Sequence, residues 1–197
     1  AIQGNFHHLA RYTQLHYTPA RSHRRRIYTL LGGTIGNLEN EPQFFRHALV
    51  AAAPGDLLLM DFTLSATEST RPEEIKQRDP ALARPIPALH EKWLKGPLLR
   101  YCVGITDAKF SYELDIDRPI QGSYGLQFIA EARITGGTSH RFCMWTVRRY
   151  SLPDLVQCLR NIGWEAVGQF PYGSTESGRP SALMMFQRRH DARGAQR

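Results

Sequence analysis

The sequence has little cysteine and no long apolar run, and both shortages narrow the class of protein. Its 197 residues include three cysteines, Cys102, Cys143 and Cys158, which are widely spaced and have apolar neighbours. Neither a disulfide framework nor a Cys-x-x-Cys metal site is indicated, so we expect buried thiols. No run of about 18 apolar residues appears, and residues 1–8 lack the charged-then-apolar order of a signal peptide. We therefore expect a cytoplasmic protein with no membrane partner.

Several motifs that carry chemistry in other proteins are also missing. Among the eight histidines only His7 and His8 are neighbours, and no His-x-x-x-His or His-Glu-x-x-His spacing occurs, so we expect no metal site. The sequence contains no Gly-x-Ser-x-Gly elbow and no P-loop. These absences count against a hydrolase and against a nucleoside triphosphatase.

Negative charge is in shortage, which leaves a formal net charge of +7. Much of the excess lies in residues 21–26, ahead of an apolar segment, and in residues 188–197 at the end of the chain. Neither cluster contains the aromatic residues that a stacking platform for nucleic-acid bases needs. We interpret them as a solvated strand flank and a frayed polar tail, so nucleic acid is not the expected partner.

The segments that are present alternate between strand and helix patterns. An apolar run over residues 25–31 predicts a buried strand that ends at Gly32-Gly33. Apolar residues at helical spacing predict a helix over 41–53, with Pro54-Gly55 as its stop signal. A second buried strand is predicted over 57–62. Together they form a parallel strand-helix-strand unit, with helices expected on both faces of the sheet, and the fold class is α/β.

The rest of the chain predicts antiparallel strands, with helices before and after them. Gly136-Gly137 lies between two alternating segments, as a hairpin turn would. Ser151 and Pro153 open a helix with an apolar stripe, which Gly163 ends. The remaining predicted elements are a helix over 7–15, one or two short helices within 65–96, strands over 110–117, 124–134 and 140–149 that extend the sheet, and final strands over 164–170 and 182–187.

The glycine-rich segment after the first predicted strand is the best candidate site. Small residues at the carboxyl end of a buried parallel strand leave a crevice in which open α/β sheets bind ligands. The spacing alone also fits a plain turn that leads the chain into the next helix, and it does not separate the two interpretations. The residues concerned are Gly32, Gly33, Thr34, Gly36 and Asn37.

From residue 31 to residue 59 the chain resembles the histidine-specific methyltransferase family of ergothioneine biosynthesis. The resemblance rests on Leu31-Gly32-Gly33-Thr34-Ile35-Gly36-Asn37-Leu38, a following helix, and Pro54-Gly55-Asp56-Leu57-Leu58-Leu59. It implies a methyltransferase that uses S-adenosylmethionine and has a Rossmann-like class I sheet, present in part, with antiparallel strands in the C-terminal half. It places Gly32, Gly33 and Thr34 beside the cofactor and Asn37 toward the methyl acceptor.

The resemblance extends upstream to Gly4-Asn5-Phe6, which is similar to the family's Gly-Asp-Phe segment beside the adenine. Asn5 replaces the acidic residue there. Its oxygen can still accept a bond from the adenine amino group but loses the assistance of charge. Phe6 retains the apolar role beside the ring. The resemblance therefore adds Asn5 and Phe6 to the cofactor-binding residues.

Other segments depart from the family. Residues 65–101 lack its Tyr-Asn-Asp element, and residues 144–150 lack its substrate-holding glutamate and serine, so we expect a small-molecule acceptor other than histidine. A first strand with a Gly-x-Gly-x-Gly loop is also not found. We therefore interpret residues 1–197 as a single domain, the C-terminal part of a methyltransferase domain. It would form a homo-oligomer or pair with an N-terminal segment.

Two alternatives remain open, and the weaker candidate residues are interpreted as structural. The chain could be a non-catalytic remnant or fragment that serves as a binding or assembly module, or part of a nucleic-acid methyltransferase. Asp61 and Glu68 are more typical of loop or cap residues than of a general base, and no catalytic residue is assigned, because methyl transfer from a sulfonium mainly needs alignment. Core or half-buried packing is expected for Tyr28, Tyr101, Trp93, Trp145 and Trp164.

Overall fold

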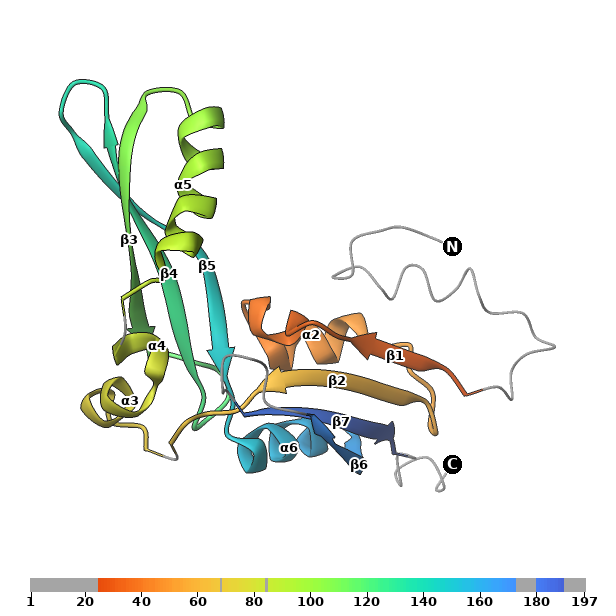
Figure 1. Cartoon of the computed structure of the whole chain (residues 1–197). Helices are drawn as coiled ribbons and strands as arrows, with labels where there is room; N and C mark the ends of the chain where they lie inside the picture. Colours follow the sequence, from red (N-terminus) through yellow and green to blue (C-terminus); the bar gives the residue numbers. More distant parts are fainter. Residues whose placement is uncertain (1–24, 68, 84, 173–179, 190–197) are drawn as a thin grey trace. The chain divides into compact units, whose positions relative to one another are not determined.

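The computed structural model of the chain describes residues 25–67, 69–83, 85–172 and 180–189 (Figure 1). These residues divide into two compact units. The first contains the chain up to Leu64, residues 119–121 and the chain from Tyr150 onward; the second contains Ser65–Arg118 and Gly122–Arg149. The helix expected over 7–15 lies outside the described residues, and the single domain over 1–197 stays a prediction.

The first unit contains a four-stranded mixed sheet. Its strands are β1 (Ile27–Leu30), β2 (Leu57–Thr63), β7 (Ser181–Arg188) and β6 (Trp164–Tyr172), in the order β1-β2-β7-β6. Strands β1 and β2 are parallel, whereas β7 runs antiparallel to both β2 and β6. The predicted strand-helix-strand unit and the α/β class, with a partial Rossmann-like sheet and antiparallel strands in the C-terminal half, are confirmed.

The connection from β1 to β2 contains a short 3-10 helix, η4 (Thr34–Asn37), and the α-helix α2 (Glu41–Ala48). Helix α2 begins where the Asn40 side chain accepts a hydrogen bond from the amide of Gln43 at 2.9 Å. It ends earlier than the predicted residue 53. The Asp56 carboxylate accepts a hydrogen bond from the amide of Ala53 at 2.9 Å. The carbonyl of Ala51 accepts one from the guanidinium of Arg26 at 2.7 Å. Side chains thus replace helical hydrogen bonding in this segment.

The predicted last helix is confirmed as α6 (Leu152–Asn161). Ser151 occupies its N-cap position, but the serine side chain makes no capping hydrogen bond. Gly163 follows the helix with a φ of 89°, a left-handed conformation that suits glycine.

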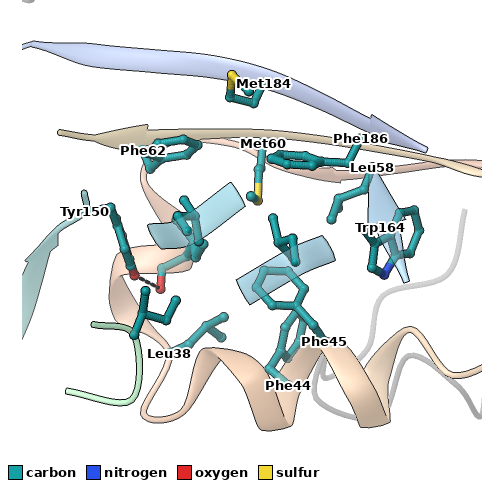
Figure 2. Packing of buried hydrophobic residues seen from close by; sticks show 14 of the residues in the cluster. Leu38, Phe44, Phe45, Leu58, Met60, Phe62, Tyr150, Trp164, Met184 and Phe186 are labelled. Atoms are coloured by element: carbon teal, nitrogen blue, oxygen red, sulfur yellow. Dashed lines mark hydrogen bonds between the residues drawn. The ribbon is translucent and has the colours of Figure 1, made fainter. Parts of the chain in front are cut away.

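A single buried cluster joins the sheet to α2 and α6. Alternate residues of β2, namely Leu58, Met60 and Phe62, face this cluster, as the pleat of a strand requires. Phe44 and Phe45 of α2 point toward Leu58 and Met60 (Figure 2). From the other helix and the antiparallel strands the cluster receives Leu155, Leu159, Trp164, Ala182, Met184 and Phe186.

The second unit holds a separate antiparallel sheet, so the prediction that these strands extend the first sheet is wrong. Its strands are β3 (Ile105–Asp115), β4 (Tyr124–Ile134) and β5 (Ser139–Arg149), in that order. Gly136 and Gly137 form the predicted hairpin turn, with φ values of 103° and 88°. Alternation of apolar and polar residues predicts a strand and a neighbouring partner strand. It does not predict which sheet the pair belongs to.

Three helices precede these strands in the described residues, where one or two were predicted: α3 (Pro72–Arg78), α4 (Pro80–Ala83) and α5 (Ala88–Tyr101). Helix α5 contacts β3 and contains Pro97 in its interior (Figure 1). Phe128 of β4 is fully buried and stacks against Phe110 and Trp145, with ring centroids 5.4 Å and 4.2 Å away. This aromatic stack links all three strands of the sheet.

Some predictions about single side chains are wrong. Cys102 and Cys143 are exposed and Cys158 is half-buried, so the expected buried thiols are not found. Cys102 lies just past the end of α5, and Cys143 lies on β5, an edge strand of its sheet. Trp93 and Tyr101 of α5 are 72% and 73% exposed. Trp164 is buried and Tyr28 and Trp145 are half-buried, as predicted.

Candidate functional site

The candidate site is the turn that follows β1, at the carboxyl ends of two parallel strands. Gly32 and Gly33 adopt φ values of 74° and 70°, in the left-handed region where a side chain is disfavoured. A Cβ atom added to either glycine would meet no heavy atom of the described residues within 4 Å. Backbone conformation, rather than crowding, therefore requires glycine at both positions, and space lies next to the turn.

Asp61 holds this turn in place from the neighbouring strand. Its Oδ1 accepts a hydrogen bond from the amide of Gly33 at 3.0 Å, and its residue is only 9% exposed. Met60 and Phe62 face the buried cluster, so Asp61 between them points to the other face of the sheet. A carboxylate at the end of an apolar strand was the one signal for Asp61 in the sequence, and it did not indicate Gly33 as the partner.

The rest of the turn is closed by its own hydrogen bonds. The Thr34 hydroxyl donates to the carbonyl of Leu31 at 2.6 Å, and the amide of Gly36 donates to the carbonyl of Gly33 at 2.9 Å. Ile35 is fully buried, and its carbonyl lies 3.1 Å from the hydroxyl of Tyr150. The turn is thus fixed to the core through Ile35 and to β2 through Asp61.

These bonds decide what the turn can offer to a ligand. Glycine-rich loops that bind phosphate do so with free backbone N–H groups. Here the N–H of Gly33 and the hydroxyl proton of Thr34 are both engaged within the protein. The Asp61 carboxylate also places a negative charge beside the turn, and this charge favours a positively charged group over an anion.

The structure brings together four of the six residues predicted to bind ligands. Gly32 and Asn37 are exposed, and Gly33 and Thr34 are half-buried. Asn5 and Phe6 lie outside the described residues, as does Glu68, the suggested partner of Asp61. The role of all six residues stays a prediction.

The described residues contain neither a candidate metal site nor a candidate membrane-spanning helix. They contain no group of three or more His, Cys, Asp or Glu side chains that could hold a metal ion. No helix within them has the length and apolar character needed to cross a membrane.

Comparisons with known proteins found similar solved structures only. No protein-family model and no curated protein matches the chain, so the resemblance to the histidine-specific family stays a prediction. Three of the similar structures are methyltransferases. They are the CcbJ methyltransferase from Streptomyces caelestis (12% identity, 96% of this chain and 63% of that chain, TM-score 0.42), an S-adenosylmethionine-dependent methyltransferase from Clostridium acetobutylicum (9%, 85% and 60%, 0.40) and the glycopeptide N-methyltransferase MtfA complexed with S-adenosylhomocysteine (13%, 95% and 60%, 0.39).

The chain spans 60% to 63% of the length of these three structures.

Proposed function

We propose that the full-length protein is a methyltransferase that transfers the methyl group of S-adenosylmethionine to a small molecule other than histidine. One observation carries the proposal: a turn of two left-handed glycines follows β1, and a carboxylate from the parallel strand β2 binds the amide of Gly33. The resemblance of residues 31–59 to a methyltransferase family assigns the cofactor to this same turn.

The charge of the turn supports this cofactor over other adenine-containing ligands. S-adenosylmethionine carries a sulfonium and an ammonium group, whereas dinucleotides and nucleoside triphosphates present phosphates. The Asp61 carboxylate accepts a hydrogen bond from the Gly33 N–H, and its negative charge would repel a phosphate at the turn. The set of donors and acceptors at the turn therefore fits a cationic ligand.

Each predicted residue has a part in this proposal. Gly32, Gly33 and Thr34 would lie along the cofactor, since the glycines let the ligand approach the backbone closely. Asn5 and Phe6 would contact its adenine, and the exposed Asn37 would face the acceptor. When bound, the cofactor supplies an already activated methyl group. The protein then mainly has to align the acceptor with that group and exclude water, which explains why no general base stands out in the sequence.

Calorimetric titration of the full-length protein with S-adenosylmethionine and with S-adenosylhomocysteine tests the proposal. We expect saturable binding of both ligands and weaker binding by Gly33→Val, which cannot adopt the left-handed turn easily. Gly137→Val is the matched control, because Gly137 also has a positive φ and open space but lies in the β4–β5 hairpin. It should bind both ligands as the wild type does.

Failure to bind either ligand would contradict the proposal and favour a non-catalytic binding or assembly module. A nucleic-acid methyltransferase would instead show affinity for DNA or RNA that falls steeply as salt is raised.

A further inference from the structure

We infer that Asp61 is a positioning residue of the candidate site and that its negative charge selects a cationic ligand. The inference rests on the proposed function and deepens it, because it assigns a role to a side chain outside the glycine turn. Asp61 acts on the turn by accepting the hydrogen bond of the Gly33 amide. It would act on the ligand through the negative charge of its carboxylate beside the turn.

The hydrogen bond accounts for the positioning role. A residue in the left-handed region is held there only when its surroundings fix it, and even glycine has other conformations of similar energy. Oδ1 of Asp61 fixes the amide of Gly33 at 3.0 Å, and Gly33 is also the N-cap residue of η4. A charge-assisted bond of this kind is roughly twice as strong as one between neutral groups.

The remaining oxygen of Asp61 accounts for the charge role. Among the described residues, Oδ2 of Asp61 has no hydrogen bond or ion pair, and it is not one of the buried polar atoms that lack a partner, so it reaches solvent beside the turn. A ligand that covered this oxygen would bury the carboxylate, which is costly without a counter-charge. A cationic group of the ligand, placed beside the turn, would supply the missing charge.

Asp56, the residue just before β2, is a carboxylate with a purely structural role and serves as a comparison. It lies at the opposite end of β2, is 2% exposed, and pairs with the guanidinium of Arg26 at 2.7 Å. It also accepts bonds from the amides of Arg26 and Ala53, each at 2.9 Å. Its charge is therefore compensated within the protein, unlike that of Asp61.

The experiment compares Asp61→Asn, Asp61→Ala and the control Asp56→Asn in the full-length protein. Hydrogen exchange at the Gly33 amide reports positioning, and calorimetric Kd values for S-adenosylmethionine and S-adenosylhomocysteine report charge. The two ligands differ in charge because only the first is a sulfonium.

We expect Asp61→Asn to keep the Gly33 amide protected, because the asparagine Oδ1 still accepts its bond. Its Kd for S-adenosylmethionine should rise about tenfold, which corresponds to about 1.4 kcal/mol, with a smaller rise for S-adenosylhomocysteine. Asp61→Ala should expose the Gly33 amide to exchange and weaken the binding of both ligands. Asp56→Asn should lower stability and leave the ratio of the two Kd values unchanged.

Two results would overturn the inference separately. Unchanged exchange at Gly33 in Asp61→Ala would refute the positioning role, and equal changes in both Kd values in Asp61→Asn would refute charge selection. If the wild-type protein binds neither ligand, the proposed function and charge selection fail together, and exchange at Gly33 still decides the positioning role.

Discussion

Tyr150 is 1% exposed, and its hydroxyl lies 2.8 Å from Oε1 of Glu41 and 3.1 Å from the carbonyl of Ile35. Glu41, at the start of α2, is equally buried. The hydroxyl therefore connects the segment before α6 to both η4 and α2, and it links the candidate site to the core.

Replacement of Tyr150 by phenylalanine should lower the free energy of unfolding by about 1.5–3 kcal/mol, the usual contribution of a buried hydrogen bond to a charged group. The edge-to-face packing of the ring on Phe62, at 5.9 Å between centroids, would be kept. Urea denaturation measures the change. Tyr101→Phe is the control, since Tyr101 is 73% exposed and should change stability by less than about 0.5 kcal/mol. Equal effects of the two substitutions would contradict the structure.

Tyr124 in the second unit predicts a pH dependence. Burial, and after it the neighbouring Asp79 carboxylate 2.9 Å from the hydroxyl, together raise the pKa of Tyr124 from 10.0 to about 12. Because the folded pKa lies above the unfolded pKa, this stability is fully present below pH 10 and is lost as the pH rises toward 12.

Denaturation of the wild type and of Tyr124→Phe between pH 8 and pH 11.5 isolates this contribution, because the other titrating groups are common to both proteins. The difference in unfolding free energy between them should shrink above about pH 10. A difference that stays constant over this range would contradict the raised pKa of Tyr124.

At the residue scale, the sequence predicts what lies close together along the chain. Gly32, Gly33, Thr34 and Asn37 are nearly contiguous, so their grouping in one turn could be predicted. Asp61 lies 28 positions from its partner Gly33, and Tyr150 lies 109 positions from Glu41. Such pairs depend on how strands and helices assemble, which no local pattern contains.

At the element scale, the glycine turn and the hairpin turn offer a comparison of backbone strain. Gly33→Ala should destabilise the protein by about 1–2 kcal/mol because alanine in the left-handed region is strained, and Gly33→Asn should cost less because asparagine tolerates that region. Gly137→Ala should destabilise to a similar degree. Only the Gly33 variants should change the Kd for S-adenosylmethionine. A loss of cofactor affinity in both alanine variants would attribute the effect to stability alone.

Element boundaries were predictable where local signals decide them. Strand β4 begins and ends at the predicted residues 124 and 134. Helix α2 stops at Ala48 instead of residue 53, because Asp56 and Arg26 bind the backbone of the following segment. Helix α5 continues through Pro97 to Tyr101, although proline usually ends a helix. Tertiary contacts thus overrode the sequence signal at the end of α2.

At the scale of the whole molecule, the division into two units raises the question of whether the units unfold together or separately. The segment from Ser65 to Arg149 leaves the first unit and returns to it, and Leu64 and Tyr150 at its two ends form an isolated bridge. Within that segment only residues 119–121 belong to the first unit, where Ile120 is 2% exposed in the buried cluster. Composition and length predict one domain, and whether the two units unfold together tests that prediction.

The two units have separate buried clusters, so we expect each to respond to its own core substitutions. Leu58→Ala, at a fully buried position of β2, should lower the exchange free energy of amides in β2 and β7 by about 2–5 kcal/mol. Phe128→Leu, in the aromatic stack, should lower that of amides in β3 and β4 by at least about 1 kcal/mol. Native-state hydrogen exchange in increasing urea resolves the two groups of amides. Equal shifts of both groups in both variants would mean that one cooperative domain unfolds as a whole, because loss of either core would then open every strand.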